Sequence, residues 1–161
     1  MAKLEVGEVA PDFTLRTAGG GEISLAEELE RAEIGAIVYF YPKAMTPGCT
    51  TEACDFRDSF ARFTGWRVVG VSPDPVERLD RFAEKYTLPF TLASDPAHEV
   101  LAAWGAWGEK KNYGRVYEGV IRSTVVVGKD SRVLLAQYNV KATGHVARLY
   151  DRVGSLQERH I

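Results

Sequence analysis

The feature that most constrains the fold of this chain is an unbroken apolar run at positions 34–41. Its residues are Ile-Gly-Ala-Ile-Val-Tyr-Phe-Tyr, so branched and aromatic side chains dominate. A strand with one face in water alternates polar and apolar residues, whereas a strand buried on both faces is apolar throughout. The run therefore predicts a strand in the middle of a parallel or mixed sheet.

Strand and helix signals alternate along the rest of the chain. Further strands are expected at residues 12–15, 66–71, 90–93, 121–127 and 132–138, and helix starts at Ser24, Thr46, Asp74, Asp95 and Thr143. Residues 108–119 are polar and contain glycine, which predicts a loop. The order predicts an α/β fold with a central mixed sheet flanked by helices, in one domain spanning residues 1–161 with a frayed tail from about 157.

Composition narrows the classes of function. The chain has 161 residues, two cysteines, and 20 Lys and Arg against 22 Asp and Glu, for a net charge of −2. This balance argues against broad binding of nucleic acid or anionic membranes, and Lys110 and Lys111 are interpreted as part of a solvated loop. No apolar run approaches the roughly 20 residues of a membrane span, and the start lacks the apolar stretch of a signal peptide. We expect a cytoplasmic protein whose cysteines are reduced.

Cys49 is placed where a thiol can become reactive. Thr46 and Pro47 predict a helix that starts directly after the buried strand, which puts Cys49 in its first turn. Ligands gather at the carboxyl ends of strands in such sheets, and the free N–H groups of a helix start favour a thiolate. The helix end alone supplies less stabilisation than a reactive thiolate needs. We therefore expect a nearby cation, an arginine from elsewhere in the fold.

Cys54 follows Cys49 after four intervening residues. In an intact helix, such positions differ by about 140° around the axis and about 7.5 Å along it, so their Cα atoms lie about 8.7 Å apart. A disulfide tolerates at most about 7 Å between Cα atoms. The two cysteines therefore cannot bond unless the first turns of the helix unwind.

Other interpretations of the cysteines stay open from spacing alone. Cys49 lies on the apolar stripe of its helix, and cysteine is often simply a small buried hydrophobe. A structural zinc site is not expected, because zinc takes four ligands and His98, His145 and His160 are scattered. The pair also lacks the Cys-x-x-Cys spacing of thioredoxin-type redox motifs.

The segment from Phe40 to Cys54 resembles the active-site segment of the peroxiredoxins. It is most similar to the bacterioferritin comigratory protein, or peroxiredoxin Q, group. The family pattern of Pro, three residues, Thr, two residues and Cys is matched by Pro42, Thr46 and Cys49, and the second cysteine of the group by Cys54. Further similar segments cover nearly the whole chain: residues 10–15, 69–72, 107–111 and 121–124.

The resemblance implies a thioredoxin-like fold and an antioxidant thiol peroxidase that acts on hydrogen peroxide and organic hydroperoxides. Cys49 would be the peroxidatic cysteine, which becomes a sulfenic acid. Cys54 would be the resolving cysteine, which forms an intramolecular disulfide that a thioredoxin-type dithiol reduces. The resemblance implies a monomer and no metal, haem or flavin cofactor.

The resemblance also assigns the remaining site residues. Arg122 matches the active-site arginine of the family and would supply the expected cation. Thr46 would bond the peroxide or the thiolate, Pro42 would shield the thiol from water, and Glu52 could orient Arg122. Ala44 and Met45 depart from the more polar pair of the group.

Two rival functions stay open. One is a dithiol–disulfide oxidoreductase that acts on proteins. The other is a non-catalytic redox sensor, in which local unfolding changes a binding surface.

Overall fold

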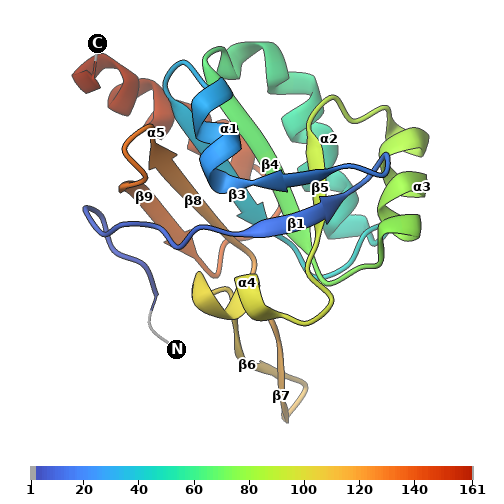
Figure 1. The fold of residues 1–161 in the computed structure, drawn as a ribbon. Helices are drawn as coiled ribbons and strands as arrows, with labels where there is room; N and C mark the ends of the chain where they lie inside the picture. Colours follow the sequence, from blue (N-terminus) through green and yellow to red (C-terminus); the bar gives the residue numbers. More distant parts are fainter. Residues whose placement is uncertain (1–2, 161) are drawn as a thin grey trace.

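A mixed sheet forms the centre of the computed structural model, which describes residues 3–160, with the backbone alone at Asn112 and positions 157–160 (Figure 1). Within these residues the sheet has seven strands in the order β2-β1-β5-β4-β3-β8-β9. The strands are β1 (Thr14–Thr17), β2 (Glu22–Ser24), β3 (Gly35–Phe40), β4 (Trp66–Ser72), β5 (Thr91–Ser94), β8 (Ser123–Gly128) and β9 (Val133–Tyr138). β4 pairs in parallel with β3 and β5, and the other pairs are antiparallel.

Helices cover both faces of this sheet, as the apolar run predicts. They are α1 (Leu25–Arg31), α2 (Pro47–Ser59) with the short 3-10 helix η1 (Phe60–Phe63), α3 (Val76–Tyr86), α4 (Glu99–Ala103) and α5 (His145–His160). In β3, Val38 and Phe40 pack in one core with α1 and α4, whereas Ile37 and Tyr39 pack in a second core with α2, α3 and α5. The predicted fold class is confirmed. No helix of the described residues is long and apolar enough to cross a membrane.

The loop predicted at residues 108–119 is wrong. β6 (Trp107–Asn112) and β7 (Arg115–Val120) form an antiparallel hairpin that projects from the body of the protein (Figure 1). Its turn is the pair Tyr113-Gly114, with φ of 51° and 76°, as a two-residue hairpin turn requires. Most side chains of β7 are exposed, so the hairpin lacks the apolar alternation that identifies a strand.

Two of the predicted helix starts, Ser24 and Thr46, are confirmed, whereas Asp74 does not start its helix. Ser24 does cap α1, because its hydroxyl accepts a bond from the Glu27 N–H. Asp74 does not cap α3, which starts after Pro75 without a side-chain cap. Thr46 occupies the N-cap position of α2, but its hydroxyl donates to the Lys43 carbonyl instead of capping the helix.

Other boundaries also differ from the predicted ones. β2 was not predicted. α4 begins at Glu99 rather than directly after Asp95, whose carboxylate accepts a bond from the Leu101 N–H. α5 begins at His145 rather than directly after Thr143, and it continues to His160. The frayed tail from about 157 stays a prediction, and Ile161 lies outside the described residues.

Candidate active site

Cys49 lies in the first turn of α2, at the carboxyl end of β3, with 1% of its surface exposed. The loop between β3 and α2 is tied to the β4–α3 connection. The Ala44 N–H donates to the Asp74 carboxylate at 2.7 Å, and the Arg78 guanidinium donates to the Ala44 carbonyl. Arg78 also pairs with Asp74 at 3.3 Å. The start of α2 is thus held in place from α3.

Arg122 reaches Cys49 because β8 runs antiparallel to β3. Ser123 lies opposite Phe40 in this pairing, so the residue before β8 is next to the segment after β3. Nη2 of Arg122 donates to Cys49 Sγ at 3.2 Å. A Cβ at Gly48 would lie 3.4 Å from Nη2, which is ordinary van der Waals contact, so the guanidinium packs closely over the start of α2. A guanidinium in this position stabilises a thiolate relative to a thiol.

Glu52 lies one helical turn after Cys49 and binds the other terminal nitrogen of the same guanidinium. Its Oε1 accepts a bond from Nη1 of Arg122 at 2.5 Å, while its Oε2 is buried and has no partner among the described residues. Burial raises the pKa of Glu52 from 4.5 to about 7, although Arg122 acts in the opposite direction. Burial acts to lower the pKa of Arg122, but Glu52 and Cys49 raise it above its ordinary value, so the guanidinium stays charged.

The raised pKa of Glu52 predicts a pH-dependent cost to stability. Below pH 4.5 the carboxyl is protonated in both states; as the pH rises towards about 7, the unfolded chain releases its proton first, which favours unfolding. The difference between the two pKa values corresponds to about 3 kcal/mol. We expect the unfolding free energy of Glu52→Gln to gain about this much relative to wild type between about pH 4.5 and pH 8, in urea titrations.

The matched control for this prediction is Glu84→Gln, which removes an exposed glutamate from α3. The difference in unfolding free energy between Glu84→Gln and wild type should change little across the same pH range. A difference between Glu52→Gln and wild type that stays constant with pH would contradict the assigned titration of Glu52.

Cys54 is half-buried in the next turns of α2, and both thiols are free. α2 is continuous from Pro47 to Ser59, so the two cysteines are held in an intact helix. On the buried side of this helix, Ala53 and Phe56 pack in the second core. A bond between the thiols would therefore need the start of α2 to leave its packed position.

A cavity of about 490 Å³ opens beside Arg122. Pro42 forms part of its wall, which places this predicted site residue next to Arg122. Lys110 of the β6–β7 hairpin also lines it. The sequence predicts Lys110 in a solvated loop, because a polar stretch gives no local sign that it pairs into a hairpin beside the cavity of Arg122.

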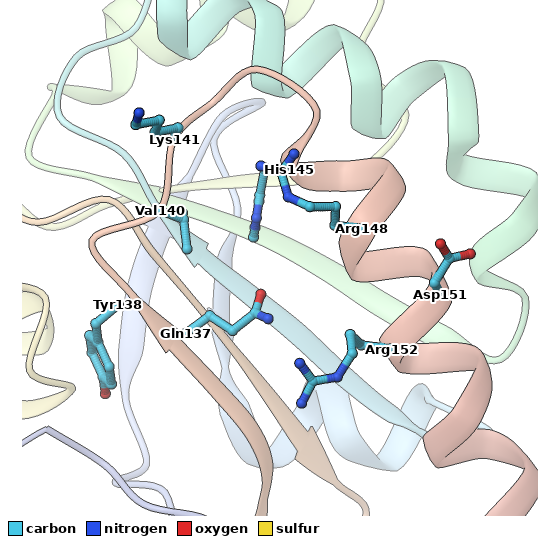
Figure 2. A pocket seen from close by; sticks show the side chains of 8 residues that line it. All are labelled: Gln137, Tyr138, Val140, Lys141, His145, Arg148, Asp151 and Arg152. Carbon is cyan, nitrogen blue, oxygen red and sulfur yellow. The ribbon is translucent and has the colours of Figure 1, made fainter.

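A second cavity, of about 650 Å³, lies between β9 and α5, and Val140 lines both this cavity and the first (Figure 2). Lys141, Arg148 and the buried His145 surround it, and no cysteine of the described chain lines it. His145 Nε2 lies 2.8 Å from the Thr124 hydroxyl, and burial lowers the pKa of His145 to about 4. Arg122, which contacts Cys49 Sγ, lines the first cavity and does not line the second. Among the described residues, no group of His, Cys, Asp and Glu side chains could hold a metal ion.

Comparison with known proteins agrees with this arrangement. Residues 6–136 match the model of the AhpC/TSA family. A Mycobacterium tuberculosis protein assigned to the peroxiredoxins is 56% identical over 149 residues, covering 91% of this chain and 93% of that protein. Peroxiredoxin Bcp of Bacillus subtilis is 40% identical over 158 residues, covering 97% and 99%. A structure of the Xanthomonas campestris bacterioferritin comigratory protein, described for its alkyl peroxide reduction activity, has a TM-score of 0.84 at 32% identity, covering 96% and 98%.

Proposed function

Because the chain belongs to the AhpC/TSA family, among the peroxiredoxins of the Bcp and peroxiredoxin Q type, we propose that it reduces hydroperoxides with Cys49 as the attacking group. The fold is thioredoxin-like, as in those relatives. The observation that carries the proposal is the 3.2 Å contact between the Arg122 guanidinium and the buried Cys49 Sγ at the start of a helix. A thiolate held there is both stabilised and screened from water.

In the first step, the Cys49 thiolate attacks one oxygen of the hydroperoxide. An S–O bond forms and the O–O bond breaks, so Cys49 becomes a sulfenic acid and the departing alkoxide takes up a proton to leave as an alcohol, or as water from hydrogen peroxide. Arg122 stabilises the negative charge as it moves from sulfur to oxygen. The Thr46 hydroxyl and Pro42 complete the site as hydrogen-bonding group and wall. Two placements support these expected roles: Thr46 is the N-cap residue of the helix that carries Cys49, and Pro42 lines the cavity beside Arg122.

In the second step, the Cys54 thiol attacks the sulfenic sulfur of Cys49, a disulfide forms and water leaves. Two positions five residues apart in an intact helix are too far apart for this bond, so α2 must unwind at its start. Unwinding separates Glu52 from Arg122 and withdraws Ala53 from the core. A dithiol of the thioredoxin class then reduces the disulfide and becomes oxidised in turn. We expect the protein to act as a monomer in a reducing cytoplasm, where both thiols would be regenerated after each turnover.

A coupled assay tests this function. The purified chain is mixed with thioredoxin, thioredoxin reductase, NADPH and either hydrogen peroxide or cumene hydroperoxide, and NADPH oxidation is followed. We expect sustained turnover that needs every component. Consumption of a single equivalent of peroxide per chain would instead indicate a redox sensor. Failure to consume peroxide, together with reduction of a protein disulfide such as that of insulin, would indicate a dithiol–disulfide oxidoreductase.

A further inference from the structure

The loop between β3 and α2, residues 41–46, is held at one residue by two side chains of the β4–α3 segment. The Ala44 N–H donates to Asp74 Oδ2 at 2.7 Å, and the Arg78 guanidinium donates to the Ala44 carbonyl through Nε at 3.1 Å and Nη2 at 2.5 Å. Arg78 Nε also lies 3.3 Å from Asp74 Oδ1, which closes a ring of three residues. We call Asp74 and Arg78 the loop clamp. It binds both backbone groups of the one residue.

The acceptor half of the loop clamp is built without the loop. Asp74 Oδ2 also accepts a bond from the Ser72 hydroxyl at 2.8 Å, and the Asp74 carbonyl accepts one from the Ser94 hydroxyl at 2.5 Å. Ser72 and Ser94 are the buried last residues of the paired strands β4 and β5, and neither strand contains a cysteine. We therefore expect Asp74 to keep its position when the loop leaves, so that the loop can return to a preformed site.

The loop itself is strained next to the clamped residue. Met45 follows Ala44 and has a φ of 71°, a left-handed conformation that is unfavourable for a residue with a side chain. Such a conformation persists only where the surrounding contacts hold it. On one side of Met45 those contacts are the loop clamp, and on the other side α2 begins at Pro47. Loss of the clamp should therefore favour a state in which the start of α2 has unwound.

We propose that Asp74 and Arg78 are positioning residues that set the balance between the two steps of the cycle. The inference rests on the proposed function, and the two residues supply no atom to the reaction. A clamped loop keeps Cys49 beside Arg122 for the attack on the peroxide, whereas a released loop lets α2 unwind so that Cys54 can reach the sulfenic acid.

The clamped state also has a cost after the first step. While α2 stays packed, the sulfenic acid of Cys49 can attack a second hydroperoxide. A second S–O bond then forms, the O–O bond breaks, and an alcohol or water leaves behind a sulfinic acid. The loop clamp therefore favours the first attack and prolongs the time during which overoxidation competes with disulfide formation.

The test variant is Arg78→Met, which removes the guanidinium of a half-buried residue and keeps an aliphatic chain in its place. The reduced protein is mixed with hydrogen peroxide without a reductant, quenched rapidly and resolved by intact mass into thiol, sulfenic, disulfide and sulfinic forms. We expect the second-order rate constant for attack to fall severalfold and the first-order rate constant for disulfide formation to rise about tenfold, as the loss of hydrogen bonds to a charged group implies. The peroxide concentration that converts half of the chains to sulfinic acid should rise by a similar factor.

Arg81→Met is the matched control, because it removes an exposed arginine from the same helix. Both rate constants should stay at their wild-type values. If both constants fall together in Arg78→Met, the residue supports the structure in general and does not balance the two steps. Unchanged constants in Arg78→Met would likewise overturn the proposal.

Amide hydrogen exchange of the reduced chain tests the loop clamp without any peroxide. Peptides that cover residues 41–53 should exchange about tenfold faster in Arg78→Met than in wild type or Arg81→Met. Equal exchange in the three proteins would show that Arg78 does not hold the loop. Absence of peroxide reduction in wild type would instead refute the proposed function and leave the exchange result as it is, so the two failures are distinguishable.

Discussion

Replacing Cys49 by serine should abolish peroxide reduction. The hydroxyl of serine is not ionised near neutral pH, so Arg122 would have no anion to stabilise and the peroxide no nucleophile to meet. We expect a loss of at least about a thousandfold, which takes the rate below detection. The measurement is NADPH oxidation in the thioredoxin-coupled assay, together with direct peroxide consumption without a reductant.

The Cys49→Ser variant should fold, because it exchanges a small buried side chain for one of almost the same shape. Circular dichroism and thermal unfolding would verify this. Retained turnover in a folded Cys49→Ser protein would show that another group attacks the peroxide, and the assignment of the site would be wrong.

Replacing Cys54 by serine should separate the two steps. Cys49 keeps its contact with Arg122, so each chain should still reduce one equivalent of peroxide at a rate close to that of wild type. The sulfenic acid then has no thiol within the same chain to condense with. We expect turnover with thioredoxin to stop after this single event, and dimedone to label Cys49 in the oxidised variant.

Two outcomes would contradict the role of Cys54. Sustained turnover in Cys54→Ser would mean that the reductant attacks the sulfenic acid directly. Loss of even the first equivalent, in a protein that is still folded, would mean that Cys54 takes part in the attack itself rather than in its resolution.

The fold could be predicted largely from local sequence patterns. The apolar run of β3 predicts a central strand correctly because every residue of that strand is buried. The β6–β7 hairpin could not be predicted in the same way, since β7 packs few side chains into either core and its burial leaves no periodic trace. The role of Asp74 could not be predicted from local sequence either. Its position before Pro75 is typical of a helix cap, yet its carboxylate accepts a hydrogen bond from the N–H of Ala44, thirty residues earlier in the chain.

The site could be predicted in part. Helix physics indicates that Cys49 needs a cation, but only the family resemblance pointed to Arg122. The physical reason for that residue is the antiparallel pairing of β3 with β8, a contact between distant segments that no local pattern encodes. Glu52 was expected as a possible partner of Arg122, and the structure places them in direct contact. The catalytic roles of these residues and the single-domain organisation stay predictions.

The central claim is that Cys49 and Cys54 of one chain form a disulfide when peroxide is reduced. The direct test is intact mass and non-reducing peptide mapping of wild type after one equivalent of hydrogen peroxide. Cleavage after Glu52 separates the two cysteines in the sequence, so a disulfide alone can keep their peptides together. The account predicts a monomeric chain that has lost two hydrogens, with these two peptides linked. Disulfides that form only between chains would contradict it.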